Sequence, residues 1–404
     1  MQQPPAFADM WAELSAIGRD HHTGGYRRPG WSGAERECAD WFAGQADARG
    51  LTLERDGNGN VVAWWGVPAG GGVVTGSHLD SVHDGGAFDG PLGVVSALAA
   101  VDRMRAAGTV PAVPVGVAVF AEEEGSRFGM PCLGSRLLTG ALAPDRAERL
   151  RDGGGRALPD VMAAAGEEPR LGPSDLLRTP SRFVELHVEQ GRGLVHADAP
   201  VGVASTIWPH GRWRFDVTGR ADHAGTTEME DRADPMLTYA MTVLAANKQA
   251  RLTGARATFG RVDVAPGTTN VIPSQVTGWL DARAPDEGSV RLLVENVTRL
   301  AEERAGRDGT AVEVTAESVT GSVAFEAGLR DRLAGLLGGV PVLATGAGHD
   351  AGVLAAAGVP TAMLFVRNPT GVSHAPDEHA DLRDCEAGVT ALTAVLTDLV
   401  GDPA

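Results

Sequence analysis

The stretch of the chain best suited to chemistry is residues 76–90, which read GSHLDSVHDGGAFDG. It places His78, Asp80 and Asp89 around a glycine-rich bend just after the apolar pair at residues 73–74. Imidazole nitrogen and carboxylate oxygen are ligands that suit zinc, manganese, cobalt or nickel, and glycines let the backbone fold back so that separate side chains converge. The alternative for this segment alone is a hydrogen-bonded polar turn. A metal site therefore requires further ligands from elsewhere in the chain.

Four predicted strands lead into residues that can bind a metal. The pairs are residues 73–74 with His78 and Asp89, residues 115–120 with the glutamates at 122–124, residues 183–186 with His187, and residues 361–366, through a loop, with His374. In open α/β sheets ligands bind at the carboxyl ends of the strands, so the architecture brings these segments together.

Five ligands suit two divalent cations better than one, provided that one carboxylate bridges them. The candidate bridge is Asp89 in its glycine-flanked bend, which gives one site of His78, Asp89 and His187 and a second of Asp89, Glu124 and His374. Two such ions about 3.5 to 4 Å apart can hold and acidify a shared water and polarise a substrate carbonyl. Zinc or manganese is expected, with cobalt or nickel also acceptable to these ligands.

The proposed water requires a base, and Glu123 is the candidate because it neighbours a ligand without being needed as one. Asp80 is expected to orient His78 through the other ring nitrogen. Each residue also has a plain alternative: a run of three glutamates is often a solvated face, His187 could be a satisfied core histidine, and His374 an ordinary loop residue. Together these alternatives would require four coincidences.

Composition limits the kind of protein that this can be. With 404 residues and 43% hydrophobic content, the chain is long enough for two or more domains, since single cores stop growing beyond about 250 to 300 residues. The net charge of -17 argues against nucleic-acid binding, which needs basic surface. We expect no membrane partner and a cytoplasmic location, because neither a signal-peptide pattern nor about 18 consecutive apolar residues occur. The three cysteines predict neither disulfides nor a thiolate zinc site.

Alternating elements must position the proposed ligands. Residues 34–49 and 93–107 have helical spacing, whereas residues 61–65, 73–76 and 115–120 are short apolar runs typical of buried strands. This alternation predicts an α/β fold with right-handed crossovers and a mostly parallel sheet covered on both faces.

The character of the chain changes after residue 210. Residues 211–323 predict exposed antiparallel strands and two helices, at about 234–250 and 290–305, in an order compatible with a split βαβ layer. Buried-strand patterns resume at residues 340–343 and 361–366. We therefore expect a discontinuous domain, residues 1–210 and 324–404, that carries the metals, and an inserted α+β domain at 211–323.

The motifs resemble those of the dinuclear-metal amidohydrolase family that contains allantoate amidohydrolase and N-carbamoyl-L-amino-acid hydrolase, within the aminoacylase and carboxypeptidase group. The resemblance covers nearly the whole chain and follows the family order of GSHLDSVHDGGAFDGPLG, FAEEEGSRFG, ELHVEQG, DHAGTTEMEDRADP, TTNVIPSQV, ATGAGHDAG and GVSHAP. It implies the same five ligands and Glu123 as the base.

The resemblance also implies roles beyond the metal site. The inserted domain would act as a lid and carry a homodimer interface, and His223 and Asn270 could serve the active site of the partner chain. The implied roles are oxyanion stabilisation by His223, a site position for Asn270, a substrate-carboxylate grip by Arg283, contact with the ureido or amide end by Gln190, and lining of the site by His349. For Arg283 the alternative is a surface ion pair.

Two departures from the family pattern concern the substrate. His210 stands in IWPHGRWRF where relatives often have glutamine, and Ala375-Pro376 follows the metal histidine where relatives often have asparagine or serine before proline. We expect His210 to be one of the substrate-binding residues. Both departures leave the metal chemistry intact.

The expected function is hydrolysis of a linear amide or ureido bond in a small carboxylate, with allantoate as the first choice. N-carbamoyl-L-amino acids, N-formyl or N-formimino amino acids such as N-formylglutamate, and a C-terminal peptide bond are alternatives that use the same apparatus. A non-catalytic metal- or ligand-binding module is the alternative of another class. An intact Glu123 beside the ligands argues against it, because a binding module needs no base.

Overall fold

The computed structural model describes residues 6–68, 70–178, 180 and 182–401. The chain divides into two compact units: the first comprises residues 1–206 and 324–404, and the second is Ile207–Val323. The sequence placed the start of the inserted domain at residue 211. We describe each unit by itself.

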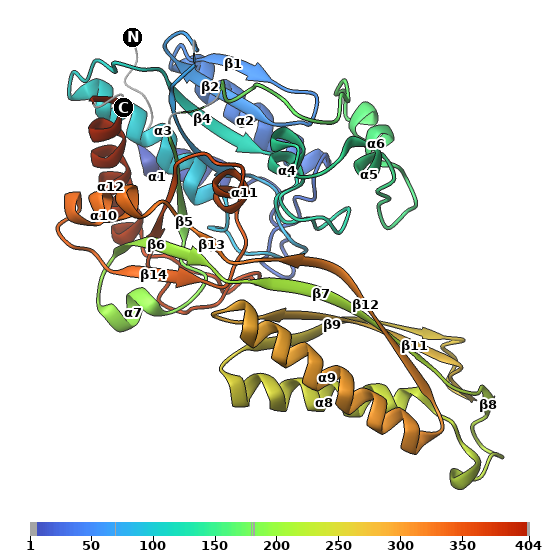
Figure 1. Ribbon diagram of the computed structural model, residues 1–404. Coiled ribbons are helices and arrows are strands. Elements are labelled where there is room, and N and C mark those ends of the chain that lie inside the picture. The colour runs from blue at the N-terminus through green and yellow to red at the C-terminus, as the bar shows by residue number, and fades with distance from the viewer. Residues whose placement is uncertain (1–5, 69, 179, 181, 402–404) are drawn as a thin grey trace. The chain divides into compact units, whose positions relative to one another are not determined.

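The first unit is built on a nine-stranded sheet (Figure 1). The strand order is β1-β2-β4-β3-β5-β15-β6-β13, with β14 paired to β6. The bounds are β1 Thr52–Arg55, β2 Val61–Trp65, β3 Val73–His78, β4 Val115–Phe120, β5 Arg182–Val188, β6 Val201–Ile207, β13 Val323–Ala324, β14 Val342–Thr345 and β15 Thr361–Val366. The four neighbours β4, β3, β5 and β15 run parallel, whereas β1, β2 and β6 pair antiparallel. The predicted mainly parallel α/β sheet is confirmed.

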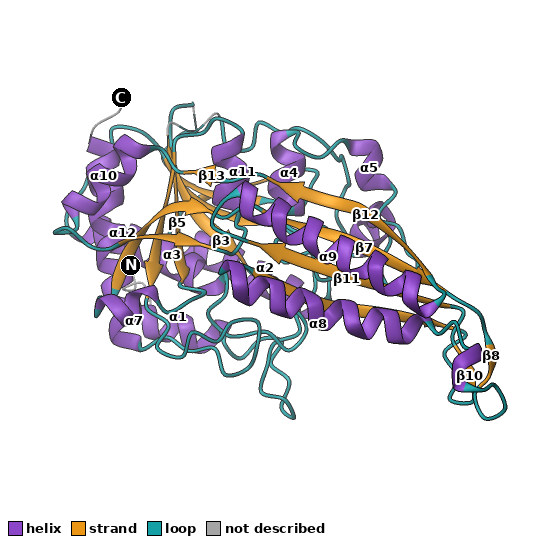
Figure 2. Cartoon of the chain, turned by 60° about the horizontal axis from the view of Figure 1, so that its bottom comes forward, coloured by secondary structure: helices purple, strands orange, loops and turns teal. Residues whose placement is uncertain are grey.

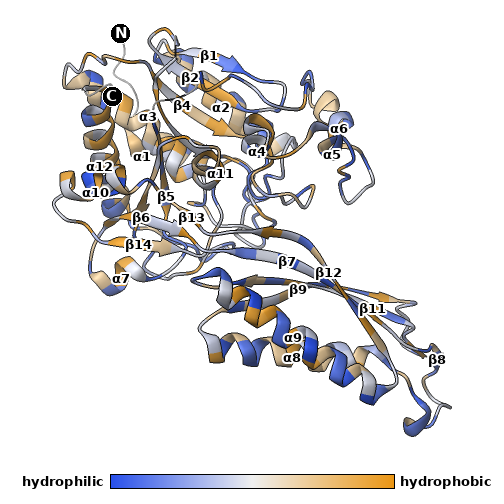
Figure 3. Cartoon of the chain, in the orientation of Figure 1, coloured by the Kyte–Doolittle hydropathy of each residue, from blue (hydrophilic) through white to orange (hydrophobic). Residues whose placement is uncertain are grey.

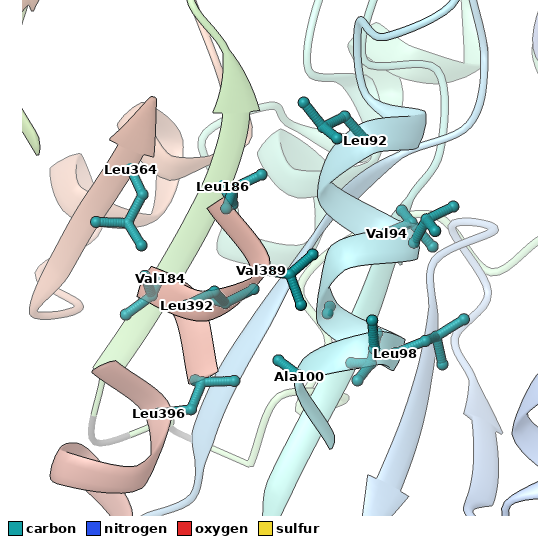
Figure 4. Packing of buried hydrophobic residues seen from close by; sticks show 14 of the residues in the cluster. Leu92, Val94, Leu98, Ala100, Val184, Leu186, Leu364, Val389, Leu392 and Leu396 are labelled. Atoms are coloured by element: carbon teal, nitrogen blue, oxygen red, sulfur yellow. The ribbon is translucent and has the colours of Figure 1, made fainter. Parts of the chain in front are cut away.

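The four parallel strands are those that the sequence assigned to the metal ligands. All residues of β3, β4 and β15 are buried, which explains why β4 and β15 read as nearly continuous apolar runs instead of alternating ones. Helices α3 (Pro91–Ala106) and α12 (Leu382–Gly401) pack on this sheet. Figure 4 shows Leu98 of α3 and Leu392 of α12 among the side chains gathered near Val184 of β5.

Further helices complete the first unit. They are α1 Phe7–Leu14, α2 Gly33–Ala48, α4 Leu133–Thr139, α5 Pro144–Glu148, α6 Leu158–Ala164, α7 Gly193–Ala197, α10 Ala327–Leu336 and α11 Asp350–Ala356. Across the described part of the chain, no helix combines the length and apolarity that crossing a bilayer demands.

The second unit is a four-stranded antiparallel sheet, in the order β12-β7-β11-β9, with two long helices (Figure 2). The bounds are β7 His210–Thr218, α8 Pro235–Thr253, β9 Arg256–Ala265, β11 Gln275–Arg283, α9 Glu287–Asp308 and β12 Ala311–Thr320, with a short pair of β8 Asp222–His223 and β10 Val271–Ile272 and a 3-10 turn, Met229–Asp231. Residues alternate between buried and accessible along β7 and β11, as expected for a sheet with one packed face.

The packed face of this sheet carries α8 and α9. Phe215 and Leu280 from the strands share a core with Leu293 and Val297 of α9. Hydrophobic and hydrophilic residues alternate around both helices in Figure 3, the pattern of helices that bury one side only. Each helix starts at an aspartate that caps its first turn and ends at a left-handed glycine, so the sequence itself defines their lengths.

Candidate metal centre

The carboxyl ends of the parallel strands bring the predicted ligands of the first unit together. His78 is the last residue of β3, and the glutamates at 122–124 begin two residues beyond the end of β4. His187 lies inside β5, one residue before its end, and His374 lies in the loop that follows β15. In the parallel register His78 is opposite Phe120 and His187 is opposite Phe365, so all four strands end at the same edge.

The bend before α3 places Asp89 close to His78. Gly90 follows Asp89 with φ of 87°, a left-handed backbone that favours glycine. A Cβ atom at Gly90 would lie 2.5 Å from the imidazole of His78. Any larger residue at position 90 would thus displace the imidazole of His78, which explains why this position requires glycine.

The two carboxylate oxygens of Asp89 face different partners. Oδ1 lies 3.1 Å from Nε2 of His187 and 3.6 Å from Nε2 of His78. Oδ2 lies 3.2 Å from Nε2 of His374, which is itself 3.4 Å from Oε2 of Glu124. The donor atoms of these two groups each lie within 4.8 Å of one another. This is the arrangement that a bridging carboxylate between two cations requires.

The histidine tautomers fit a metal. Nδ1 of His78 lies 3.1 Å from the carbonyl oxygen of Asp80, and Nδ1 of His187 lies 2.9 Å from that of Val188. A carbonyl only accepts, so each Nδ1 carries a proton, and a cation could take the lone pair of each Nε2 in place of a second proton. Both Nε2 atoms are buried and have no hydrogen-bond partner among the described residues. A divalent cation would satisfy both, and the residues present therefore fit one.

Asp80 connects the histidine to the glutamates. Its Oδ1 lies 3.4 Å from Nδ1 of His78 and accepts a hydrogen bond of 3.1 Å from the backbone N–H of Glu123. Its Oδ2 accepts one of 3.1 Å from the backbone N–H of Glu124. The sequence predicted contact with the histidine only. The two backbone bonds show that Asp80 also holds the turn after β4.

The electrostatics of the group are those of closely packed opposite charges. Burial by itself lowers the pKa of His374, but Asp89 and Glu124 outweigh it and raise that pKa to about 9. Burial raises the pKa of Glu124 to about 7, and the nearby Asp89 carboxylate adds to the effect. Burial also raises the pKa of Glu123 well above its ordinary value. Glu123 and Glu124 therefore lack enough compensating positive charge, which cations would supply.

Gln190 and His349 also lie in this group. The amide nitrogen of Gln190 donates to Oδ2 of Asp89 at 2.7 Å and to the hydroxyl of Ser373 at 3.0 Å. The ring of His349 lies 4.4 Å from that of His187, centre to centre. Burial and the neighbouring His187 lower the pKa of His349 well below its ordinary value, so this ring is neutral.

The predicted substrate residues of the second unit fall into two clusters. His210 and Arg283 are directly opposite each other where β7 begins and β11 ends, and Arg283 donates to both oxygens of Asp281 at 2.7 and 3.0 Å. His223 and Asn270 lie at the other end of the sheet, where the backbone N–H of Ala224 donates to the carbonyl of Asn270. A strand of nine residues separates the clusters by about 27 Å.

Several buried residues of the first unit escaped the sequence analysis. Glu378 accepts from the backbone N–H groups of Phe88 and Asp89 at 2.8 and 3.0 Å and from the hydroxyl of Ser373 at 3.1 Å, so it joins the Asp89 bend to the His374 loop. In the sequence, the only indication of this role is that a glutamate stands four residues after His374, and such a glutamate resembles an ordinary charged loop residue.

A second missed group lies behind His349. Asp350 bonds to the hydroxyl of Ser135, and Glu185 accepts from the hydroxyl of Ser77 and from the backbone N–H of Ala351. No local pattern marked these residues, because their partners lie more than 100 positions away in the chain.

Comparisons of the sequence place this geometry among known proteins. The model of peptidase family M20/M25/M40 matches residues 74–398. An N-carbamoyl-L-amino acid amidohydrolase of Geobacillus stearothermophilus is 36% identical over 400 residues, which cover 95% of this chain and 96% of that protein. An allantoate amidohydrolase of Escherichia coli K12 is 31% identical over 404 residues, covering 96% of this chain and 95% of that protein.

Solved structures share the fold over nearly the full length. An amidase of the hydantoinase/carbamoylase family from Burkholderia vietnamiensis superposes with a TM-score of 0.90 at 28% identity, covering 98% of this chain and 97% of its own. AtUAH in complex with glyoxylate superposes with a TM-score of 0.89 at 26% identity, again covering 98% and 97%.

Proposed function

The chain belongs to peptidase family M20/M25/M40, and from this premise we propose that it hydrolyses the ureido or N-carbamoyl group of a small carboxylate. It is a hydrolase of the allantoate and N-carbamoyl-amino-acid amidohydrolase family, whose members act on linear amides. The observation that carries the metal-dependent mechanism is the arrangement of three histidines around the two oxygens of Asp89. The ureido or N-carbamoyl group is supported by the names of the similar proteins.

We propose that His78, Asp89 and His187 hold one divalent cation, and that Asp89, Glu124 and His374 hold the other. The orphaned Nε2 atoms and the uncompensated carboxylates support this assignment. When bound, the two ions would acidify a water and polarise the scissile carbonyl.

Glu123 is the proposed base of the reaction. Its Oε2 lies 3.8 Å from Nε2 of His78, beside the ligands and outside the proposed coordination groups. There it can take a proton from the attacking water and deliver it to the leaving nitrogen. Asp80 keeps both Glu123 and His78 in place through the contacts described above.

We propose that Arg283 binds the substrate carboxylate. Arginine recognises a carboxylate bidentately, and in the structure the guanidinium of Arg283 makes such a pair with Asp281, which a substrate carboxylate would have to displace. AtUAH binds glyoxylate, a small carboxylate, which supports a substrate of this class. His210, directly across from Arg283, is the neighbour through which this chain would differ from its relatives in substrate choice.

We also propose a homodimer in which the partner chain completes the site. Arg283 lies at one end of the four-stranded sheet, and the separate β8–β10 pair that carries His223 beside Asn270 lies beyond the other end of β7, a strand of about 27 Å, which is too far for both to contact one small substrate. Two copies of the second unit could supply one cluster each. Leu237, Met241 and Leu244 form an exposed apolar stripe on α8, at 45%, 44% and 63% exposure, which supports an interface there.

A substrate panel tests the proposed function. Allantoate, an N-carbamoyl-L-amino acid, N-formylglutamate and a dipeptide are offered to the protein loaded with zinc or manganese, and ammonia, amino acid and formate are measured. We expect release of ammonia from allantoate, or from the N-carbamoyl-L-amino acid that the 36% identical relative favours. Hydrolysis of the dipeptide alone would contradict the proposal.

Chelation gives an independent test. Removing divalent ions should abolish hydrolysis, and adding zinc or manganese should restore it, because the side chains of the ligand group cannot replace a metal ion as the Lewis acid that acidifies a water. Full activity of the chelated protein would refute the metal mechanism. Stoichiometric metal uptake with no hydrolysis of any compound would instead favour a non-catalytic binding module.

A further inference from the structure

Cys132 lies beside the turn that carries Glu123. It precedes α4, and its backbone has φ of 53°, in the left-handed region. Its N–H donates to the carbonyl of Glu123 at 2.6 Å, and the next two residues continue this pairing, from Leu133 to Glu122 and from Gly134 to Ala121. The backbone of Cys132 is therefore held against the glutamate turn by three consecutive hydrogen bonds.

The side chain of Cys132 points to the carboxylate of Glu123. Its Sγ lies 3.2 Å from Oε1 and donates a hydrogen bond to it. Cys132 is 4% exposed, and burial, together with the nearby Glu123, raises the pKa of its thiol well above the ordinary value. The thiol thus stays protonated, which makes it a hydrogen-bond donor and a poor nucleophile.

The two oxygens of Glu123 consequently have different surroundings. Oε1 is bonded to the thiol, while Oε2 lies 3.8 Å from Nε2 of His78. A glutamate side chain has several rotatable bonds, so fixing one oxygen limits where the other can lie. The backbone bonds and the thiol together define one orientation of the carboxylate.

We propose that Cys132 is a positioning residue, whose thiol holds Oε1 of Glu123 so that Oε2 faces the metal ligands and the substrate. This inference rests on the proposed role of Glu123 as base. It assigns a function to a residue outside the ligand set and outside the motifs that indicated the family.

Replacement of the thiol tests this role. Cys132→Ala should lower kcat about tenfold, because loss of a bond to a charged group misplaces the base, while KM stays within about twofold. Cys132→Ser restores a donor and should return kcat to within about threefold of the wild-type value. Metal content and melting temperature should remain those of the wild type in both variants. Cys385→Ala, which removes a buried thiol of the core, is the matched control.

Each other outcome has a definite meaning. A wild-type kcat in Cys132→Ala would overturn the inference. So would a Cys132→Ser variant as slow as Cys132→Ala, or a loss of kcat that follows loss of metal, because either result indicates a structural role. If Cys132→Ala does not fold, Cys132→Gly removes the thiol and suits the left-handed backbone. A fully active Glu123→Gln would refute the proposed base and, with it, the positioning role of Cys132.

Discussion

One carboxylate organises the centre at the scale of single residues. Asp89 turns one oxygen toward His78 and His187 and the other toward His374, so the two ion sites that we propose follow from its two oxygens. Glu123 and Glu124 are adjacent in the chain, yet Glu124 belongs to one of these donor groups and Glu123 to neither. Two identical side chains can therefore serve as ligand and as base.

The first prediction at this scale concerns the base. Glu123→Gln should lower kcat by about 10² to 10⁴, because the amide cannot accept the proton of the attacking water. Metal content, measured by atomic absorption, should remain two ions per chain. The exposed Glu168→Gln serves as the control for loss of a glutamate charge. A variant that turns over at the wild-type rate would show that another group acts as base.

A second prediction concerns Asp350. Burial, with the nearby Glu185, raises its pKa from 3.8 to about 8. In the metal-free protein the folded state keeps a proton that the unfolded state loses between about pH 4 and pH 8, so its contribution to stability is present at low pH and is lost as pH rises through this window.

The test compares unfolding of metal-free wild type and Asp350→Asn. The asparagine has no proton to lose, so the free energy of unfolding of the wild type should fall relative to the variant by up to about 1.4 kcal/mol per pH unit in that window. Chemical denaturation at several pH values measures the difference. Parallel pH curves for the two proteins would contradict it, and the exposed Asp175→Asn is the control.

At the scale of elements, two loops far apart in the sequence must be held together. Glu378 joins the bend before α3 to the loop after β15, and a Cβ at Gly86 would lie 2.2 Å from its Oε1, so the bend closes tightly around the carboxylate. Helix α4 similarly holds the turn at the end of β4, because the backbone N–H groups of its first two residues donate to the carbonyls of residues 121 and 122.

Removal of Glu378 should therefore weaken metal binding. Glu378→Ala leaves two backbone N–H groups without their acceptor and frees the Asp89 bend, so metal affinity should fall about 10- to 100-fold. Calorimetric titration of the chelated protein with zinc measures this metal affinity. The neighbouring exposed Asp377→Ala should bind as the wild type does. An unchanged affinity in Glu378→Ala would show that the loops are held by other contacts.

At the scale of the whole molecule, the prediction concerns the exposed apolar stripe on α8, which we propose as part of the dimer interface. Leu244→Glu places a charge in the proposed dimer interface and should convert dimers to monomers, as measured by light scattering after gel filtration. Hydrolysis should be lost with the dimer, because His223 and Asn270 would then be missing from each site. Val110→Glu, at a 90% exposed apolar residue of the first unit, is the control for replacing an exposed apolar side chain by a negative charge. Fully active monomers would refute the shared site.

Most of the architecture could be predicted from local pattern. The strand predicted at residues 115–120 is β4, and apolar runs at β3, β5 and β15 identified the parallel centre of the sheet, because strands buried on both faces carry few polar residues. The rule that parallel strands present their carboxyl ends at one edge then predicts that His78, His187 and the glutamates lie close together.

The sequence by itself thus determined the fold class, the family and the set of candidate ligands, since each is written in short-range spacing and motif order. Only the tertiary structure decided which oxygen of Asp89 faces which histidine, that Glu378 closes the site and that the thiol of Cys132 meets Glu123. These contacts depend on turns with unusual backbone angles and, for Glu378, on a partner almost 290 residues away, and no local pattern encodes them.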